Sequence, residues 1–79
     1  MGWSNGSEIA DKIWRGIKPF IPSDERALAE VSKRIYKIFE EYDADDWGYQ
    51  LQDKESLFYT YMKLNEPEEF KELMEEMYE

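Results

Sequence analysis

Residues 24–42 read DERALAEVSKRIYKIFEEY, and this stretch decides the fold. Its apolar residues recur every three or four positions, so they form one stripe over about four turns of an α-helix. They are Leu28, Val31, Ile35, Ile38, Phe39 and Tyr42. Ser23 can cap the N-terminus of this helix, and Asp24 and Glu25 are acids that the positive end of the helix dipole favours. The stretch therefore predicts an amphipathic helix that buries its stripe.

The polar face of this helix has two readings. Arg26 and Glu30, and likewise Lys37 and Glu41, stand four residues apart and can pair along the helix. The first reading is a solvated face with salt bridges, on which Lys33 also lies. The second is a nucleic-acid-binding stripe, but the acids later in the chain would repel phosphates.

A shorter helix is predicted before this one, at residues 7–17. The segment Asn5-Gly6-Ser7 offers capping side chains. Gly16, Pro19 and Pro22 should end the helix, because proline lacks the amide proton and disfavours helix in the residue before it. The apolar residues at helical spacing are Ile9, Ile13, Trp14 and Ile17.

A loop and a third helix are predicted after residue 42. Residues 43–48 break the helical periodicity and read as a loop. Asp53 can cap the helix that follows, whose apolar residues are Leu57, Phe58, Tyr61, Met62 and Leu64. Tyr59 lies farthest from that apolar side, so we expect it to be exposed, either as a contact residue or as an ordinary surface tyrosine.

The last predicted helix is acidic on its outer face. Asn65 as cap, Pro67 in the first turn and Glu68 three residues after the cap are typical of a helix start. The inner side would hold Phe70, Leu73, Met74, Met77 and Tyr78, and the outer face carries Glu68, Glu69, Glu72, Glu75, Glu76 and Glu79. At about 1.5 Å per residue the six charges span roughly 16 Å, or about one per 3 Å. Phosphates along one DNA strand are about 3.4 Å apart.

The acidic face is part of a wider imbalance of charge. Residues 1–37 contain seven Lys or Arg and five acids, whereas residues 38–79 contain three Lys and fourteen acids. Like charges three or four residues apart on a helix cost about 0.2–0.5 kcal/mol per pair, and acids near a helix C-terminus oppose the dipole. Lys71 offsets part of this cost through Glu68 and Glu75, and the net penalty, on the order of 1 kcal/mol, is appreciable for a small domain. Either function requires this face, or acidity keeps an aromatic-rich protein soluble.

The 79 residues predict one all-α domain, residues 1–79, with three long helices and a shorter one. No cysteine is present, so packing must hold the fold. Trp3 is expected to pack on the first helix and Trp47 to close the loop over the core, a partner-facing role being the alternative for each. The predicted core is Ile13, Trp14, Val31, Ile35, Ile38, Phe39, Leu57, Tyr61, Phe70, Leu73 and Met77.

Metal and catalytic motifs are weak. Asp43, Asp45 and Gly48 match the first, third and sixth positions of a calcium loop, but Trp47 and Lys54 occupy the fifth and twelfth. The absence of His and Cys excludes ordinary zinc sites and Ser-His or Cys-His nucleophiles. We therefore predict a protein that is not an enzyme and uses no metal or cofactor. No apolar run is long enough for a membrane span and the chain opens with no signal segment, so the cytoplasm is expected.

Three features together resemble a group of small uncharacterised phage and prophage proteins. They are the opening Met1-Gly2-Trp3-Ser4 with Gly6 and Glu8, the acidic stretch of residues 43–52 that contains Trp47, and the short acidic C-terminal helix. The resemblance implies a viral or prophage origin and expression inside a bacterial cell. Tyr49 and Leu51 depart from the pattern around Gln50 and Gln52, and those relatives share no known activity, so no site residue carries over.

We expect a non-enzymatic binding protein that docks on a basic surface of a host protein. By analogy with phage antirestriction proteins, the target would be a nucleic-acid-binding defence or processing protein, inhibited by DNA mimicry, with no direct binding of nucleic acid or membrane. The predicted partner-binding residues are Asp43, Asp45, Asp46, Tyr59, Glu68, Glu69, Glu72, Glu75, Glu76 and Glu79. The alternative is a structural or assembly protein that self-associates through exposed apolar residues. The oligomeric state stays open.

Overall fold

The structure is a computed structural model that describes residues 6–42, 44 and 47–77. Four α-helices and two short 3-10 helices make up the fold, and no strand occurs in the part of the chain described. Their bounds are α1 Gly6–Ile17, η1 Lys18–Phe20, α2 Glu25–Glu41, η2 Gly48–Gln52, α3 Leu57–Asn65 and α4 Pro67–Met77. The predicted all-α class is confirmed.

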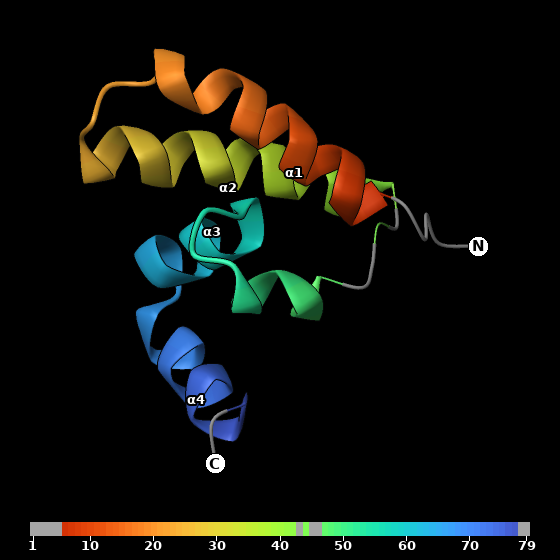
Figure 1. Ribbon diagram of the computed structural model, residues 1–79, viewed down its shortest axis with the longest axis vertical. Helices are drawn as coiled ribbons and strands as arrows, with labels where there is room; N and C mark the ends of the chain where they lie inside the picture. The colour runs from red at the N-terminus through yellow and green to blue at the C-terminus, as the bar shows by residue number, and fades with distance from the viewer. Residues whose placement is uncertain (1–5, 43, 45–46, 78–79) are drawn as a thin grey trace.

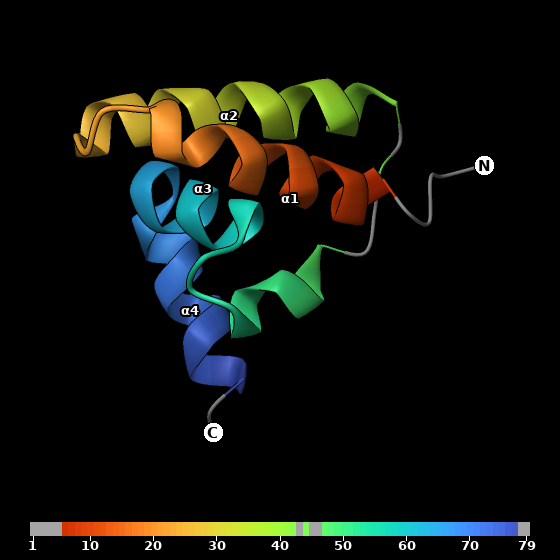
Figure 2. The ribbon, with the colours of Figure 1, turned by 45° about the horizontal axis from the view of Figure 1, so that its top comes forward.

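The helices are arranged as a pair, a crossing helix and a projecting helix. α1 and α2 run antiparallel side by side, as one layer (Figure 1). α3 lies beneath this layer and packs mainly on α2, while η2 lies beside α3 (Figure 2). α4 packs on α3 and projects away from α1 and α2. The C-terminal helix is therefore the most peripheral of the four.

α1 turns its small residues and its tryptophan inward. Ala10 and Trp14 are fully buried, and Ser7 is buried one turn earlier. Trp14 can lose all its contact with water only by facing the core, and the small residues before it let α1 come close to its neighbours. Ile13 is consequently turned away and is 43% exposed, so its predicted place in the core is wrong.

α2 begins at a cap one residue later than predicted. The Asp24 carboxylate accepts a hydrogen bond from the Arg26 amide at 3.3 Å, so Asp24 rather than Ser23 is the cap. Ile35 is buried, as predicted, and the other core residues of this helix are only half-buried. Ile38 is 53% exposed, so its predicted place in the core is wrong. The side of α2 that faces the core is centred on Ile35 and the buried Ser32, and Ile38 lies outside it.

Four rings fill the space between α2, η2 and α3. The Tyr36 ring lies 4.3 Å from that of Tyr61, 5.6 Å from Phe58 and 4.9 Å from Trp47, measured between centroids. Trp47 is 8% exposed and donates its indole N–H to the carbonyl of Ala44 at 3.2 Å. The expectation that Trp47 closes the loop over the core is confirmed. Trp3 lies outside the described residues.

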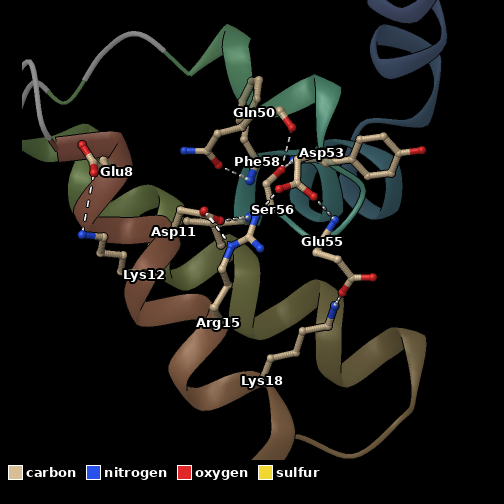
Figure 3. Close-up of polar contacts among 12 residues, drawn as sticks. Glu8, Asp11, Lys12, Arg15, Lys18, Gln50, Asp53, Glu55, Ser56 and Phe58 are labelled. Carbon is tan, nitrogen blue, oxygen red and sulfur yellow. Dashed lines mark hydrogen bonds and ion pairs between the residues drawn. The ribbon is translucent and has the colours of Figure 1, made fainter.

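The start of α3 is held by groups from other parts of the chain (Figure 3). The amide of Leu57 donates to the Asp11 carboxylate of α1 at 2.8 Å, and the amide of Phe58 donates to the side-chain oxygen of Gln50 at 3.0 Å. Ser56 is the cap, since its hydroxyl accepts from the third amide at 3.2 Å. Asp53, the predicted cap, instead follows η2 and accepts from a backbone amide two residues later.

Gln50 fastens η2 to both neighbouring helices. Its side chain is 1% exposed, and its amide nitrogen donates to the carbonyl of Ser7 in α1 at 2.9 Å. Its side-chain oxygen accepts from Phe58, and its own carbonyl accepts from the Ser56 hydroxyl at 2.7 Å. A buried amide whose nitrogen and oxygen each have a partner on a different helix fixes the relative position of three elements.

Candidate functional site

The glutamates of α4 form a continuous exposed face. Glu68, Glu69, Glu72, Glu75 and Glu76, here called the α4 glutamate face, are all exposed. The helix places them along about 12 Å at about 1.5 Å per residue. The structure thus brings together five of the predicted partner-binding residues. The remaining acids, Asp43, Asp45, Asp46 and Glu79, lie outside the described residues.

α4 starts at a fixed point, although its cap differs from the prediction. Pro67 is the first helical residue, where its missing amide proton costs nothing, and the carbonyl of Glu66 accepts from Phe70 at 2.8 Å. Asn65 belongs to α3 and does not cap α4. Its side-chain amide donates to the carbonyls of Ala29 and Tyr61, each at 3.1 Å, which ties the end of α3 to α2.

The inner side of α4 is only partly covered. Phe70, Leu73 and Met74 are half-buried against the core, and within Pro67–Met77 no residue is fully buried. Met77 is 37% exposed, so its predicted place in the core is wrong. α4 lies at the rim of the fold, and packing from the rest of the protein leaves its glutamates uncovered.

Tyr59 is part of this packing and is not an isolated surface residue. Its ring is half-buried and meets the ring of Phe70 edge-on at 4.9 Å. The expectation that Tyr59 is exposed is therefore wrong, because its ring packs on Phe70 and helps to hold α4 against α3. Its remaining surface lines an open groove of about 450 Å³, together with Glu25, Leu28, Lys54, Thr60, Lys63 and Leu64.

Basic residues of α1 and η1 pair with acids outside α4. Arg15 pairs with Asp11 at 2.8 Å and also with Asp53, while Lys18 pairs with Glu55 at 2.7 Å (Figure 3). The amide of Glu55 and then Arg15 lower the pKa of Asp53, and Lys18 lowers that of Glu55. The pairs with Asp53 and Glu55 tie the junction of η2 and α3 to α1 and η1.

Further along the surface, Glu30 pairs with Arg34 at 3.1 Å, in place of the predicted pair with Arg26. The fifth ion pair seen among the described residues joins Glu8 and Lys12. None of the five includes a member of the α4 glutamate face. Lys71 is the one cation within Pro67–Met77, so α4 carries five exposed glutamates and a single lysine, and its net charge is strongly negative.

Two further glutamates extend the negative surface and were missed by the sequence analysis. Glu40 of α2 accepts a hydrogen bond from the Tyr36 hydroxyl at 2.6 Å. Burial raises the pKa of Tyr36, and the hydrogen bond to Glu40 and nearby negative charges, including Glu69, raise it further. Burial also raises the pKa of Tyr61, followed by the charges of Glu66, Glu40 and Glu69. Carboxylates from α2, the α3–α4 junction and α4 therefore act on the same tyrosine pair.

No local pattern marks Glu40 and Glu66 as members of one surface. Glu40 lies on the predicted second helix, and Glu66 stands between a supposed cap and a proline. Glu40, Glu66 and Glu69 come together around Tyr36 and Tyr61 only because α3 packs on α2 and α4 packs on α3, which is a tertiary property.

The described residues offer no metal centre. No group of three or more Asp and Glu among them could hold a metal ion, and two positions of the incomplete calcium loop, Asp43 and Asp45, lie outside them. In the same part of the chain, no helix is both long and apolar enough to cross a membrane. The arrangement is thus that of a charged surface on a small helical scaffold.

Comparison of the chain with protein-family models, curated proteins and solved structures gave no match. The resemblance to small phage proteins therefore stays a prediction.

Proposed function

We propose that this protein is a non-enzymatic binding protein that docks its α4 glutamate face on a basic surface of a host nucleic-acid-binding protein. The carboxylates would occupy positions that the target keeps for phosphates, and the target would be a defence or processing protein inside a bacterial cell. The protein itself would bind neither nucleic acid nor membrane. The observation that carries the proposal is that five exposed glutamates on one helix take part in none of the ion pairs found among the described residues.

The position of α4 supports this proposal. A helix that projects from the fold can enter a groove that normally holds a nucleic acid strand, whereas a helix packed within a layer cannot. The spacing of charge on α4, about one carboxylate per 2–3 Å of axis, is close to the phosphate spacing of about 3.4 Å along a DNA strand. Glu40 and Glu66 would widen the footprint beyond a single helix face.

The energetics of the face favour a functional origin. Glu68 and Glu72, Glu72 and Glu76, and Glu72 and Glu75 are like-charge neighbours on one helix, and each such pair costs about 0.2–0.5 kcal/mol. Lys71 offsets only part of this cost, and a local cost that the fold leaves largely uncompensated is expected where a partner supplies the compensation.

The test is a pull-down from bacterial cytoplasm at two salt concentrations, followed by competition. A captured target should be a nucleic-acid-binding protein, should be lost as salt rises, and should be displaced by its own nucleic acid. The triple change Glu72→Gln, Glu75→Gln and Glu76→Gln should weaken capture.

The matched control is the change of Glu25, Glu30 and Glu41 to Gln on the exposed face of α2, which alters net charge by the same amount. The control should bind like the unmodified protein. If the α4 triple change raises thermal stability and leaves target affinity untouched, the glutamates serve no docking role and the proposal fails.

A second candidate function is favoured by the uncovered apolar side chains. Ile9, Ile13 and Ile38 are each more than 40% exposed, and Phe20 is 88% exposed. A structural or assembly protein that self-associates would use such residues, and acidity would then serve solubility. Its mass in solution should rise with concentration, independently of any host protein.

A further inference from the structure

The open groove beside Tyr59 has no role in the proposed function. It is lined by the start of α2, the turn before α3 and α3 itself, and its volume is about 450 Å³. On α3 the lining positions 59, 60, 63 and 64 fall within an arc of about 140°, at about 100° per residue. The apolar lining residues Leu28, Tyr59 and Leu64 are only half-buried, so the core leaves part of their surface uncovered. Pockets that bind ligands have volumes of about 300–1,000 Å³, and this groove falls within that range.

Two lysines give the groove a charge opposite to that of the chain. Lys54 lies in the turn before α3 and Lys63 in the last turn of α3, and both are exposed. Neither takes part in any of the five ion pairs found among the described residues. Glu25 is the one acid of the lining, so two lysines and one glutamate give the lining a formal charge of +1, whereas the whole chain carries −9. The groove therefore favours a ligand that combines an apolar group with anionic groups.

The two lysines come from opposite ends of α3, which sets the spacing of the anionic groups. The helix rises about 9 Å from Leu57 to Lys63, and Lys54 lies before its start. In an extended peptide, carboxylates four residues apart are about 13 Å apart and lie on the same side as the residue midway between them. The long, flexible lysine side chains can accommodate the remaining difference in spacing. We infer that the groove binds an acidic peptide segment of a partner protein, in which an apolar residue stands two positions from an acid on each side.

Other anionic ligands fit this surface less well. Tyr59 packs on Phe70 of α4, so the groove lies beside the helix that carries the α4 glutamate face. A nucleic acid strand that extends beyond the groove would meet these carboxylates and be repelled. A small amphipathic anion would keep much of its surface in water, because the groove is open, whereas small-molecule pockets bury about 70–90% of their ligand. The inference does not rest on the proposed function, since the two partners carry opposite charges, and either can fail alone.

Amide chemical shifts measured by NMR test where such a peptide binds. The probe is a synthetic peptide in which one leucine stands two positions from a glutamate on each side. Titration should shift the amides of Lys54, Thr60 and Lys63 and leave those of Ile9 and Ile13 on α1 unchanged. Binding should weaken as salt rises, and a peptide with glutamines in place of the glutamates should bind about fivefold or more weakly. Equal affinity for both peptides would overturn the inference.

Substitution of the lysines tests the charge pairing. Lys54→Gln with Lys63→Gln should weaken binding of the glutamate peptide by about fivefold or more, and Glu25→Gln should strengthen it. Lys33→Gln with Lys37→Gln is the matched control, since both residues are exposed on α2, lie outside the groove and change the net charge equally. The control should change affinity by less than about twofold. Because both changes remove the same ion pairs, the glutamine peptide should bind the groove variant as well as it binds the unmodified protein.

Three results would overturn the inference. An equal loss for the groove variant and its control would mean that net charge, and not the groove, attracts the peptide. Groove amides that respond to a single-stranded oligonucleotide or to dodecanoate at lower concentration than to the peptide would assign the groove to that class of ligand. Shifts that depend on the protein's own concentration, without peptide, would assign it to a second copy. The triple change of the α4 glutamate face to glutamine should leave peptide binding undiminished, so this inference and the proposed function are tested separately.

Discussion

Gln50 provides the sharpest test of how this small fold is held together. Gln50→Ala removes the side-chain amide that the Ser7 carbonyl and the Phe58 amide both use, at 2.9 and 3.0 Å. A buried polar group left without its partner costs about 1–3 kcal/mol, so two such groups cost about 2–6 kcal/mol. Water can enter the polar space that the amide leaves and can recover part of this, so we expect a loss of about 2–4 kcal/mol.

That loss is large for this chain. At about 0.05–0.15 kcal/mol per residue, the free energy of unfolding of 79 residues is about 4–12 kcal/mol. Urea unfolding, followed by circular dichroism and tryptophan fluorescence, should show a lower midpoint with an unchanged slope. Gln52→Ala is the matched control, since Gln52 lies two residues away in η2 but is exposed. It should change stability by less than about 0.5 kcal/mol.

The reasoning is refuted if both variants lose the same free energy. Equal losses would mean that the Gln50 contacts form without contributing to stability. Gln50→Glu gives an independent check, because a protonated carboxyl can donate to Ser7 and accept from Phe58 but a carboxylate cannot donate. Burial raises the pKa of such a carboxyl, so this variant should be more stable at acid pH and should lose stability as pH rises.

Three further predictions concern single side chains. Asp53 has a lowered pKa in the folded state, so its ionised form stabilises the fold above the ordinary aspartate pKa of about 4, and this stabilisation is lost as pH falls further. Acid titration followed by circular dichroism should therefore show a smaller loss of stability below about pH 4 for Asp53→Asn than for the unmodified protein. Tyr36 has a raised pKa in the folded state, so its neutral hydroxyl stabilises the fold below about pH 10, and this stabilisation is lost at higher pH. Tyr36→Phe should remove a late step from the alkaline titration of tyrosine followed by absorbance. Asn65→Ala removes a hydrogen bond that ties the end of α3 to Ala29 of α2 and a second one to Tyr61 within α3, and it should cost about 1–2 kcal/mol in urea unfolding. The exposed neighbour change Lys63→Ala should cost less than about 0.5 kcal/mol.

The sequence was most informative where local pattern and packing agree. The periodicity of residues 24–42 correctly predicts α2, and Pro67 correctly marks the first turn of α4. The predicted caps failed because several capping residues stand within three positions of each other. Ser23 competes with Asp24, and Asp53 with Ser56. Which residue caps α3 depends on hydrogen bonds to distant residues, one of them more than forty positions away and the other across the η2 turn. A rule based on neighbouring residues does not contain this information.

The face that α1 buries could not be predicted from periodicity. The sequence analysis placed both Ile13 and Trp14 in the core, and the structure confirms Trp14, which is buried with Ala10, but exposes Ile13. One indole removes more surface from water than one isoleucine, and small neighbours allow closer packing. Gln50 was missed for a related reason: a glutamine on a short turn looks like a surface residue, and only its distant partners make it a buried one.

The imbalance of charge along the chain has a different meaning once the chain is folded. Arg15 and Lys18 from the basic half meet Asp53 and Glu55 from the acidic half, so these opposite charges help to close the fold. Such exposed pairs contribute little to stability, but they determine which acids remain without a cation. Since the acids they use belong to the η2–α3 junction, the charge that remains unneutralised is concentrated on α4. α4 packs mainly on α3, so substitutions on the α4 glutamate face should leave the ion pairs of Arg15 and Lys18 intact.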